Sequence, residues 1–106
     1  MKNLEIIESL LNLGKIPKND EMTNAQFKEY DDLLISFEDN LSFDEAEKLM
    51  GLFSDDCDDL NWGLLHLIES VPYSEVDRYK ALISKCSNKE FREIFEIRLN
   101  NWLNKQ

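Results

Sequence analysis

The residues of this sequence that could carry acid–base chemistry are a histidine and a glutamate one helical turn apart. His66 is the only histidine, and Glu69 follows three residues later, a spacing that places both on one face of a helix. A carboxylate in that position can orient an imidazole as a general base. However, the chain offers no evident nucleophile beside the pair, no glycine-rich phosphate loop and no second histidine for a two-metal helical site. We therefore predict that the protein is not an enzyme and that His66 is half-buried within the helix packing.

A run of aspartates is the second candidate for chemistry, as a metal site. A calcium loop needs oxygen ligands at positions 1, 3, 5 and 12, and glycine at position 6. Neither register within the run supplies them: counted from Asp55, the third position is Cys57, and counted from Asp59, the fifth is Gly63. The sequence therefore predicts no metal site, and nothing in it points to a cofactor.

The distribution of charge is more informative than either of these candidates. Of the 22 acidic side chains, 14 fall between residues 20 and 59, where only Lys28 and Lys48 oppose them. That segment has a net charge of -12, the other residues have +2, and the chain has -10. Such a concentration repels nucleic acid and anionic membranes, and it attracts a basic partner.

Part of this charge is ordinary for helix starts. Carboxylates in the first turn of a helix stabilise it by about 0.3–1 kcal/mol each, so a merely solvated surface is the plain alternative. That alternative does not explain four aspartates within five residues, or acids in the middle and at the end of a predicted helix. We predict a recognition surface formed by Tyr30, Asp31, Asp32, Glu38, Asp39, Asp55, Asp56, Asp58, Asp59 and Trp62.

The elements that position these residues are predicted to be helices only. Ser/Thr-x-x-Glu/Gln/Asp capping signatures open apolar periods at Thr23, Ser42, Ser74 and Ser87. Gly14 and Pro72 mark two helix ends, and period-two alternation is absent. With 106 residues the chain predicts a single all-helical domain, 1–106. The predicted helices are 2–13, 24–38, 42–53, 58–71, 74–85 and 88–104.

Short links predict antiparallel neighbours, arranged as a helical bundle or as three stacked hairpins. The longest link, Gly14 to Met22, is the segment we expect to be most mobile, and Gly63 is expected to allow a neighbouring helix to approach closely. Cys57 and Cys86 are expected to be reduced thiols, with a disulfide as the open alternative. The sequence shows no signal peptide and no long apolar run, so we expect a soluble, cytoplasmic monomer.

The stretch Asp55–Glu69 resembles a small all-helical family of bacterial immunity proteins, which are encoded beside polymorphic toxins, including those of contact-dependent growth inhibition. The resemblance lies in the acidic run, in the spacing of Gly63, His66 and Glu69, and in an apolar helix that ends near Pro72. It implies a non-enzymatic inhibitor that binds one cognate toxin domain in the cytoplasm.

The charge pattern and the resemblance lead to the same hypothesis. Nucleases need basic clefts to hold a phosphate backbone, and an acidic inhibitor can occupy such a cleft and associate quickly by electrostatic steering. We therefore expect neutralisation of a toxin, expected to be a nuclease, through direct protein–protein binding. The alternatives are a nucleic-acid mimic that inhibits a DNA- or RNA-binding protein, and a plain acidic helical adaptor.

Overall fold

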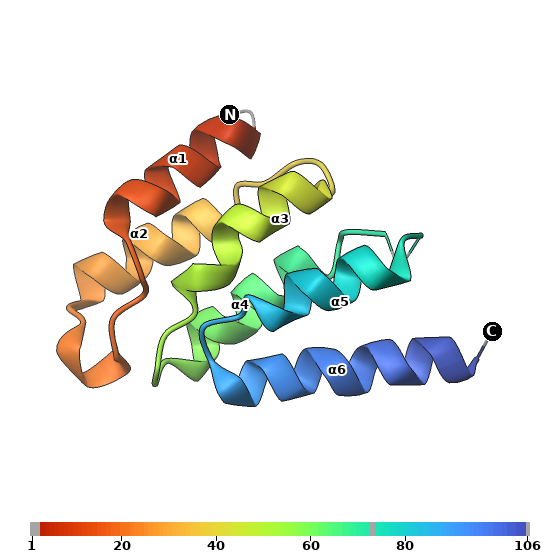
Figure 1. The fold of residues 1–106 in the computed structure, drawn as a ribbon. Helices are drawn as coiled ribbons and strands as arrows, with labels where there is room; N and C mark the ends of the chain where they lie inside the picture. The colour runs from red at the N-terminus through yellow and green to blue at the C-terminus, as the bar shows by residue number, and fades with distance from the viewer. Residues whose placement is uncertain (1–2, 73, 106) are drawn as a thin grey trace.

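The structure, a computed structural model, describes residues 3–72 and 74–105, and within them the chain is helical and has no strand. The predicted fold class is therefore confirmed. Six α-helices are labelled in Figure 1, and two short 3-10 helices, η1 and η2, lie between them. Their bounds are α1 Asn3–Leu13, η1 Asn19–Glu21, α2 Asn24–Leu34, α3 Phe43–Leu49, η2 Met50–Leu52, α4 Asp58–Ile68, α5 Val76–Ser84 and α6 Lys89–Asn104.

Two of the predicted capping boxes open helices as expected. Thr23 Oγ1 accepts the Gln26 N–H at 3.1 Å, while Gln26 Oε1 accepts the Thr23 N–H at 2.8 Å, at the start of α2. Ser42 and Glu45 form the same reciprocal pair at the start of α3. Each box satisfies backbone donors that have no partner inside the helix.

The two later boxes, Ser74–Asp77 and Ser87–Glu90, do not form. The Ser87 hydroxyl instead donates to the Phe53 carbonyl oxygen at 3.0 Å, so the adjacent Asn88 becomes the N-cap of α6. Helix α5 begins without a side-chain cap. Capping chemistry read from the sequence therefore located these helices, and at α6 a tertiary contact of Ser87 moved the start of the helix by one residue.

Helices α2 and α4 both end before the predicted limits at residues 38 and 71. In each case a serine just beyond the helix donates its hydroxyl to a carbonyl of the last turn, Ser36 to Asp32 and Ser70 to Leu67. A serine hydroxyl competes in this way with the backbone N–H groups that would extend a helix.

The helices form two layers, the order expected of stacked hairpins. Within one layer α3 contacts α1 and α5, and within the other α4 contacts α2 and α6. Contacts of α1 with α2 and of α5 with α6 join the layers. Figure 1 shows the helices of each layer running in the same direction, opposite to that of the other layer. The extents of the molecule, 43 × 29 × 18 Å, agree with two layers packed about 8–10 Å apart.

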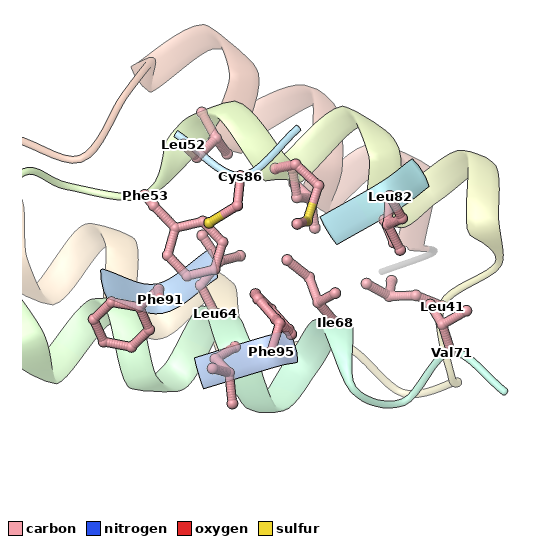
Figure 2. Close-up of a cluster of buried hydrophobic side chains, with 14 of the residues drawn as sticks. Leu41, Leu52, Phe53, Leu64, Ile68, Val71, Leu82, Cys86, Phe91 and Phe95 are labelled. Atoms are coloured by element: carbon pink, nitrogen blue, oxygen red, sulfur yellow. The ribbon is translucent and has the colours of Figure 1, made fainter. Parts of the chain in front are cut away.

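One hydrophobic cluster draws on all six helices and on the links between them. Figure 2 shows Phe53, which is fully buried in the link before α4, among side chains of the last hairpin, which α5 and α6 form. Its ring lies 5.6 Å from that of Phe91 and 5.9 Å, edge to face, from that of Phe95. This contact fixes the link from η2 to α4 against α6.

The link after α1 is held in place by the chain segment that carries the aspartates. Gly14 ends α1 with φ +84°, as the sequence predicted, and its N–H donates to the Leu10 carbonyl at 3.0 Å. Beyond it, the N–H of Ile16 donates to the Leu52 carbonyl at 3.0 Å. We expected Gly14 to Met22 to be the most mobile link; these two backbone hydrogen bonds tie its first residues to α1 and to η2.

Candidate functional site

Four of the predicted site residues, Asp55, Asp56, Asp58 and Asp59, lie together on the exposed turn that leads into α4. Three of them line a shallow open depression of about 230 Å³ with Asn19 and the buried Cys57. We call residues 55–59 the acidic loop. Asp58 and Asp59 occupy the first turn of α4, where the helix dipole favours negative charge.

The acidic loop is anchored at Ser54, which is fully buried. Asn61, also fully buried, accepts the Ser54 N–H through Oδ1 at 2.8 Å and donates from Nδ2 to the Ser54 carbonyl at 3.0 Å. Asn88 Nδ2 donates to the same carbonyl at 2.8 Å. Two side-chain amides from α4 and from the start of α6 therefore satisfy one backbone unit, and no buried polar group of that unit is left without a partner.

The Ser54 side chain extends this network to both sides of the loop. Its hydroxyl donates to the Pro17 carbonyl at 2.9 Å and accepts the Asp56 N–H at 3.1 Å. The N–H of Asn19 donates to the Asp56 carbonyl at 2.7 Å. The aspartates are thus attached to a backbone that is fixed before any partner arrives, which lowers the entropy cost of binding.

Sequence reasoning missed Ser54, Asn61 and Asn88. A signal was present, because Asn61 is a polar residue between Leu60 and the apolar remainder of α4, and a buried asparagine needs hydrogen-bond partners. Nothing in the sequence indicated that those partners are the two backbone groups of Ser54.

More of the negative charge between residues 20 and 59 is paired with cations than the sequence suggests. Lys15 Nζ lies 2.9 Å from Asp55 Oδ1, and this hydrogen bond, with the added attraction of the charge, lowers the pKa of Asp55. Asp56, Asp58 and Asp59 have no ion pair among the described residues. The net charge presented by the loop and its lysine is therefore smaller than that of four free carboxylates.

Two cations of the last hairpin form ion pairs with two further acids. Arg78 of α5 pairs with Asp44 at 3.0 Å, and Lys85 pairs with Glu47 at 2.7 Å. Each of these partners is more than thirty positions away in the sequence, so counting charge within a segment overstated the repulsion. The pairs are exposed, and pairs of this kind contribute no more than about 1 kcal/mol each.

Tyr30 does not belong to the predicted surface. Its side chain is 4% exposed, and its hydroxyl donates to the Gly14 carbonyl at 2.9 Å, close to the carbonyl of Leu13 at 3.2 Å. Burial raises the pKa of this hydroxyl, and the charge of Glu29 raises it further. Tyr30 closes the end of α1, and the assignment of its ring to a partner contact was wrong.

Glu38 and Asp39, two of the remaining predicted acids, do not form one surface with the acidic loop. Asn3 Nδ2, at the start of α1, donates to the Asp39 carbonyl at 3.2 Å, whereas Lys15, just past the end of α1, holds Asp55. Helix α1 has 11 residues and is about 16 Å long. Glu38 and Asp39 therefore lie at one end of the molecule and the acidic loop at the other. Asp31 and Asp32 lie exposed on α2, with Asp32 paired to Lys28 at 2.8 Å.

Trp62, His66 and Glu69 share one side of α4, as predicted, but His66 is exposed. The rings of Trp62 and His66 lie 5.9 Å apart, and the His66 side chain is 63% exposed. His66 Nδ1 lies 3.6 Å from Glu69 Oε1, and Glu69 also pairs with Arg98 of α6. The prediction of a half-buried histidine was wrong because the side of α4 that bears it faces solvent. Glu69 ties α4 to α6.

Gly63 of α4 lies beside α2. It is exposed, and a Cβ placed there would lie 3.7 Å from Leu34 Cδ1, which is ordinary van der Waals contact. A neighbouring helix, α2, faces Gly63, but the packing of α4 against α2 does not require glycine at this position.

Cys57 and Cys86 are free and buried, as the reduced-thiol prediction expected. Burial raises the pKa of both thiols, which disfavours the reactive thiolate. Within residues 3–72 and 74–105, no group of three or more histidine, cysteine, aspartate or glutamate side chains is arranged to hold a metal ion.

A larger hollow, of about 460 Å³, lies between α5 and α6, away from the acidic loop. Its lining combines Lys80, Arg92 and Glu96 with polar and apolar neighbours, and it contains no histidine or cysteine. It offers no nucleophile paired with a base, and we do not assign it catalytic chemistry.

No protein-family model matches the chain, and neither the curated proteins nor the solved structures contain a match. Among the described residues, no helix has the length and apolar character that a membrane crossing requires. The resemblance to immunity proteins stays a prediction.

Proposed function

We propose that the protein binds and neutralises a basic protein domain, the toxin of a polymorphic toxin system, through a surface that includes the acidic loop. The observation that carries this proposal is the fixed loop itself. It presents Asp56, Asp58 and Asp59 without a cationic partner among the described residues, on a backbone held by the Ser54 network.

The repulsion among these carboxylates is offset by a favourable interaction only if a cation approaches them. Several unpaired acids on one turn raise the local concentration of a positively charged partner and speed its association. A toxin nuclease has a basic cleft for the phosphate backbone, and an acidic protein placed in that cleft excludes the substrate. Acting by occupation, the protein needs no catalytic residue and no cofactor. It would act as a monomer in the cytoplasm of the cell that it protects.

The resemblance of Asp55–Glu69 to immunity proteins supports this choice of partner. A nucleic-acid mimic would use the same charge against a DNA- or RNA-binding protein, and an acidic adaptor would use it for assembly. The difference lies in the consequence of binding, because only an immunity protein restores growth to cells that express the toxin.

The direct test uses the partner expected for an immunity protein, which is the C-terminal domain encoded by the gene immediately upstream of the gene for this protein. Its association rate is measured by stopped-flow mixing, its affinity by calorimetry, and protection as growth during expression of that domain. The double variant Asp58→Asn/Asp59→Asn should slow association about tenfold at low salt, because asparagine keeps the capping capacity but removes the charge.

The matched control is Glu38→Gln/Asp39→Asn, which removes the same charge at the other end of the molecule. At about 0.15 M ionic strength it should associate within about twofold of the natural protein, because the Debye length of about 8 Å is shorter than the length of α1 that separates the two groups of acids. Equal loss in both doubles would reject the acidic loop as the binding surface. Absence of binding by the natural protein would reject this partner.

A further inference from the structure

The outer side of the layer formed by α2, α4 and α6 carries one exposed apolar residue on each of its helices. Ile35 follows the last turn of α2 and is 73% exposed, Trp62 of α4 is 38% exposed, and Ile97 of α6 is 59% exposed. The only other large apolar side chains exposed to this degree among the described residues are Leu4 and Leu11 on α1, in the other layer.

The side of α4 that faces away from the core is one continuous stripe. Asp59, Trp62, Gly63 and His66 recur at the spacing of one helical face, and all four are exposed. Trp62 contacts the ring of Phe91 on α6 at 5.3 Å, edge to face. Gly63 contributes no side chain, so the stripe is low at its centre, beside the indole.

The two neighbouring helices continue this stripe on either side. On α2, Leu34 faces Gly63, and the next residue, Ile35, lies farther toward solvent. On α6, Phe91 and Arg98 both contact α4. Ile94 lies between them on the same face, and Ile97 follows Ile94 by one helical turn. The apolar side chains of the three helices thus flank the tryptophan.

Acidic side chains line one edge of this apolar strip. Asp31, Asp59 and Glu90 each precede an apolar residue of the strip by one helical turn. The three helices run in the same direction (Figure 1), Leu34 lies beside Gly63, and Phe91 contacts Trp62. Asp31 near the end of α2 and Glu90 at the start of α6 therefore lie at about the level of the first turn of α4, which holds Asp59. None of the three has an ion pair among the described residues.

We infer that this outer side of the α2–α4–α6 layer is the docking surface for the basic domain, with Trp62 as its central anchor and Asp31, Asp59 and Glu90 as its charged edge. This inference rests on the proposed function and extends it from the acidic loop across three helices. Protein interfaces place an aromatic residue in an apolar centre and keep charges at the rim, and a rim of carboxylates is complementary to a cationic partner.

The test uses substitutions that remove an apolar contact without changing charge. Ile97→Gln and Ile35→Gln alter the two flanks of the strip, and Leu4→Gln is the matched control, because Leu4 is 52% exposed on the other layer. Affinity for the upstream-encoded domain is measured by calorimetry, and thermal unfolding verifies that each variant folds. We expect each flank variant to weaken binding by about tenfold and Leu4→Gln to stay within about twofold of the natural protein.

The outcomes separate this inference from the proposed function. If Asp58→Asn/Asp59→Asn weakens binding and the flank variants do not, the docking surface is wrong while the acidic-loop proposal stands. If Leu4→Gln weakens binding as much as Ile97→Gln, the layer is wrong. If the natural protein does not bind the domain, both proposals fall.

Discussion

Asn61 makes two hydrogen bonds to the backbone of Ser54, accepting from its N–H at 2.8 Å and donating to its carbonyl at 3.0 Å. The side-chain amide thereby acts as a second peptide group alongside the chain. Because the link before α4 has no strand beside it, this amide supplies the pairing that a neighbouring strand would give in a sheet.

Replacing Asn61 by alanine should lower the free energy of unfolding by about 2–3 kcal/mol, because the buried Ser54 N–H loses its partner and a small cavity opens. Denaturant unfolding measures the loss. Asn100→Ala, at an exposed position of α6, is the control and should change stability by no more than about 0.5 kcal/mol. A similarly small change at Asn61 would contradict the anchoring role of this pair.

Gly63→Ala should stabilise the protein by about 0.5–1 kcal/mol, because alanine reduces the entropy of the unfolded chain and the new methyl meets only Leu34 at ordinary distance. Gly14→Ala should instead destabilise by about 1–2 kcal/mol, since Gly14 has φ +84°. Melting temperatures of the two variants should move in opposite directions, and a shared direction would contradict one of these two assignments.

Removing Lys15 should raise the pKa of Asp55 toward its ordinary value, because the hydrogen bond and charge of Lys15 lower it. A lowered pKa means that this pair stabilises the fold above the unfolded pKa of aspartate, about 3.9, and that the contribution is lost as pH falls through the folded pKa. NMR titration of the Asp55 carboxyl carbon in Lys15→Gln checks the direction. An unchanged titration would show that the pair does not persist in solution.

Association with the basic domain should slow markedly as ionic strength rises from about 0.05 to 0.5 M, because the Debye length falls below the separation of the approaching charges. Stopped-flow mixing measures the rate. The variant that carries asparagine at positions 55, 56, 58 and 59 should bind more slowly and depend less on salt. A rate that does not respond to salt in the natural protein would remove electrostatic steering from the mechanism.

His66→Gln should change stability by no more than about 0.5 kcal/mol and weaken binding of the basic domain by less than about tenfold, because the histidine is exposed beside Trp62 and glutamine keeps a hydrogen-bonding group of similar reach. A catalytic histidine would cost about 100-fold or more in activity. Protection and melting temperature measured on the same variant decide between the two, and a stable protein without protection would require a functional role for this residue.

The sequence was sufficient for the helices because their signals are local. The capping boxes at Thr23 and Ser42 and the turn at Gly14 each involve residues within one turn of one another, so a single sequence contains the whole interaction. The predicted N-cap at Ser87 is one residue too early, because the Ser87 hydroxyl donates to a carbonyl 34 positions away.

The candidate site was predicted less completely, because its geometry depends on contacts between hairpins. The sequence identified the acidic loop and the shared face of Trp62 and His66, but it grouped acids that lie at opposite ends of α1. It also placed Tyr30 outside, although the aromatic ring and the hydroxyl of this residue both find partners inside. Position along the chain does not determine which charges become neighbours once the hairpins stack.

The bond from Asn88 to the Ser54 carbonyl also sets an order of events during synthesis. The acidic loop belongs to the second hairpin, whereas Asn88 begins the last helix of the third, and the ribosome makes it 34 residues later. We expect a nascent chain that ends before α6 to carry all the aspartates on a loop that still moves. If the protein binds a basic domain as proposed, high-affinity capture would then be a property of chains that have completed α6, and unfinished chains would not compete for that domain.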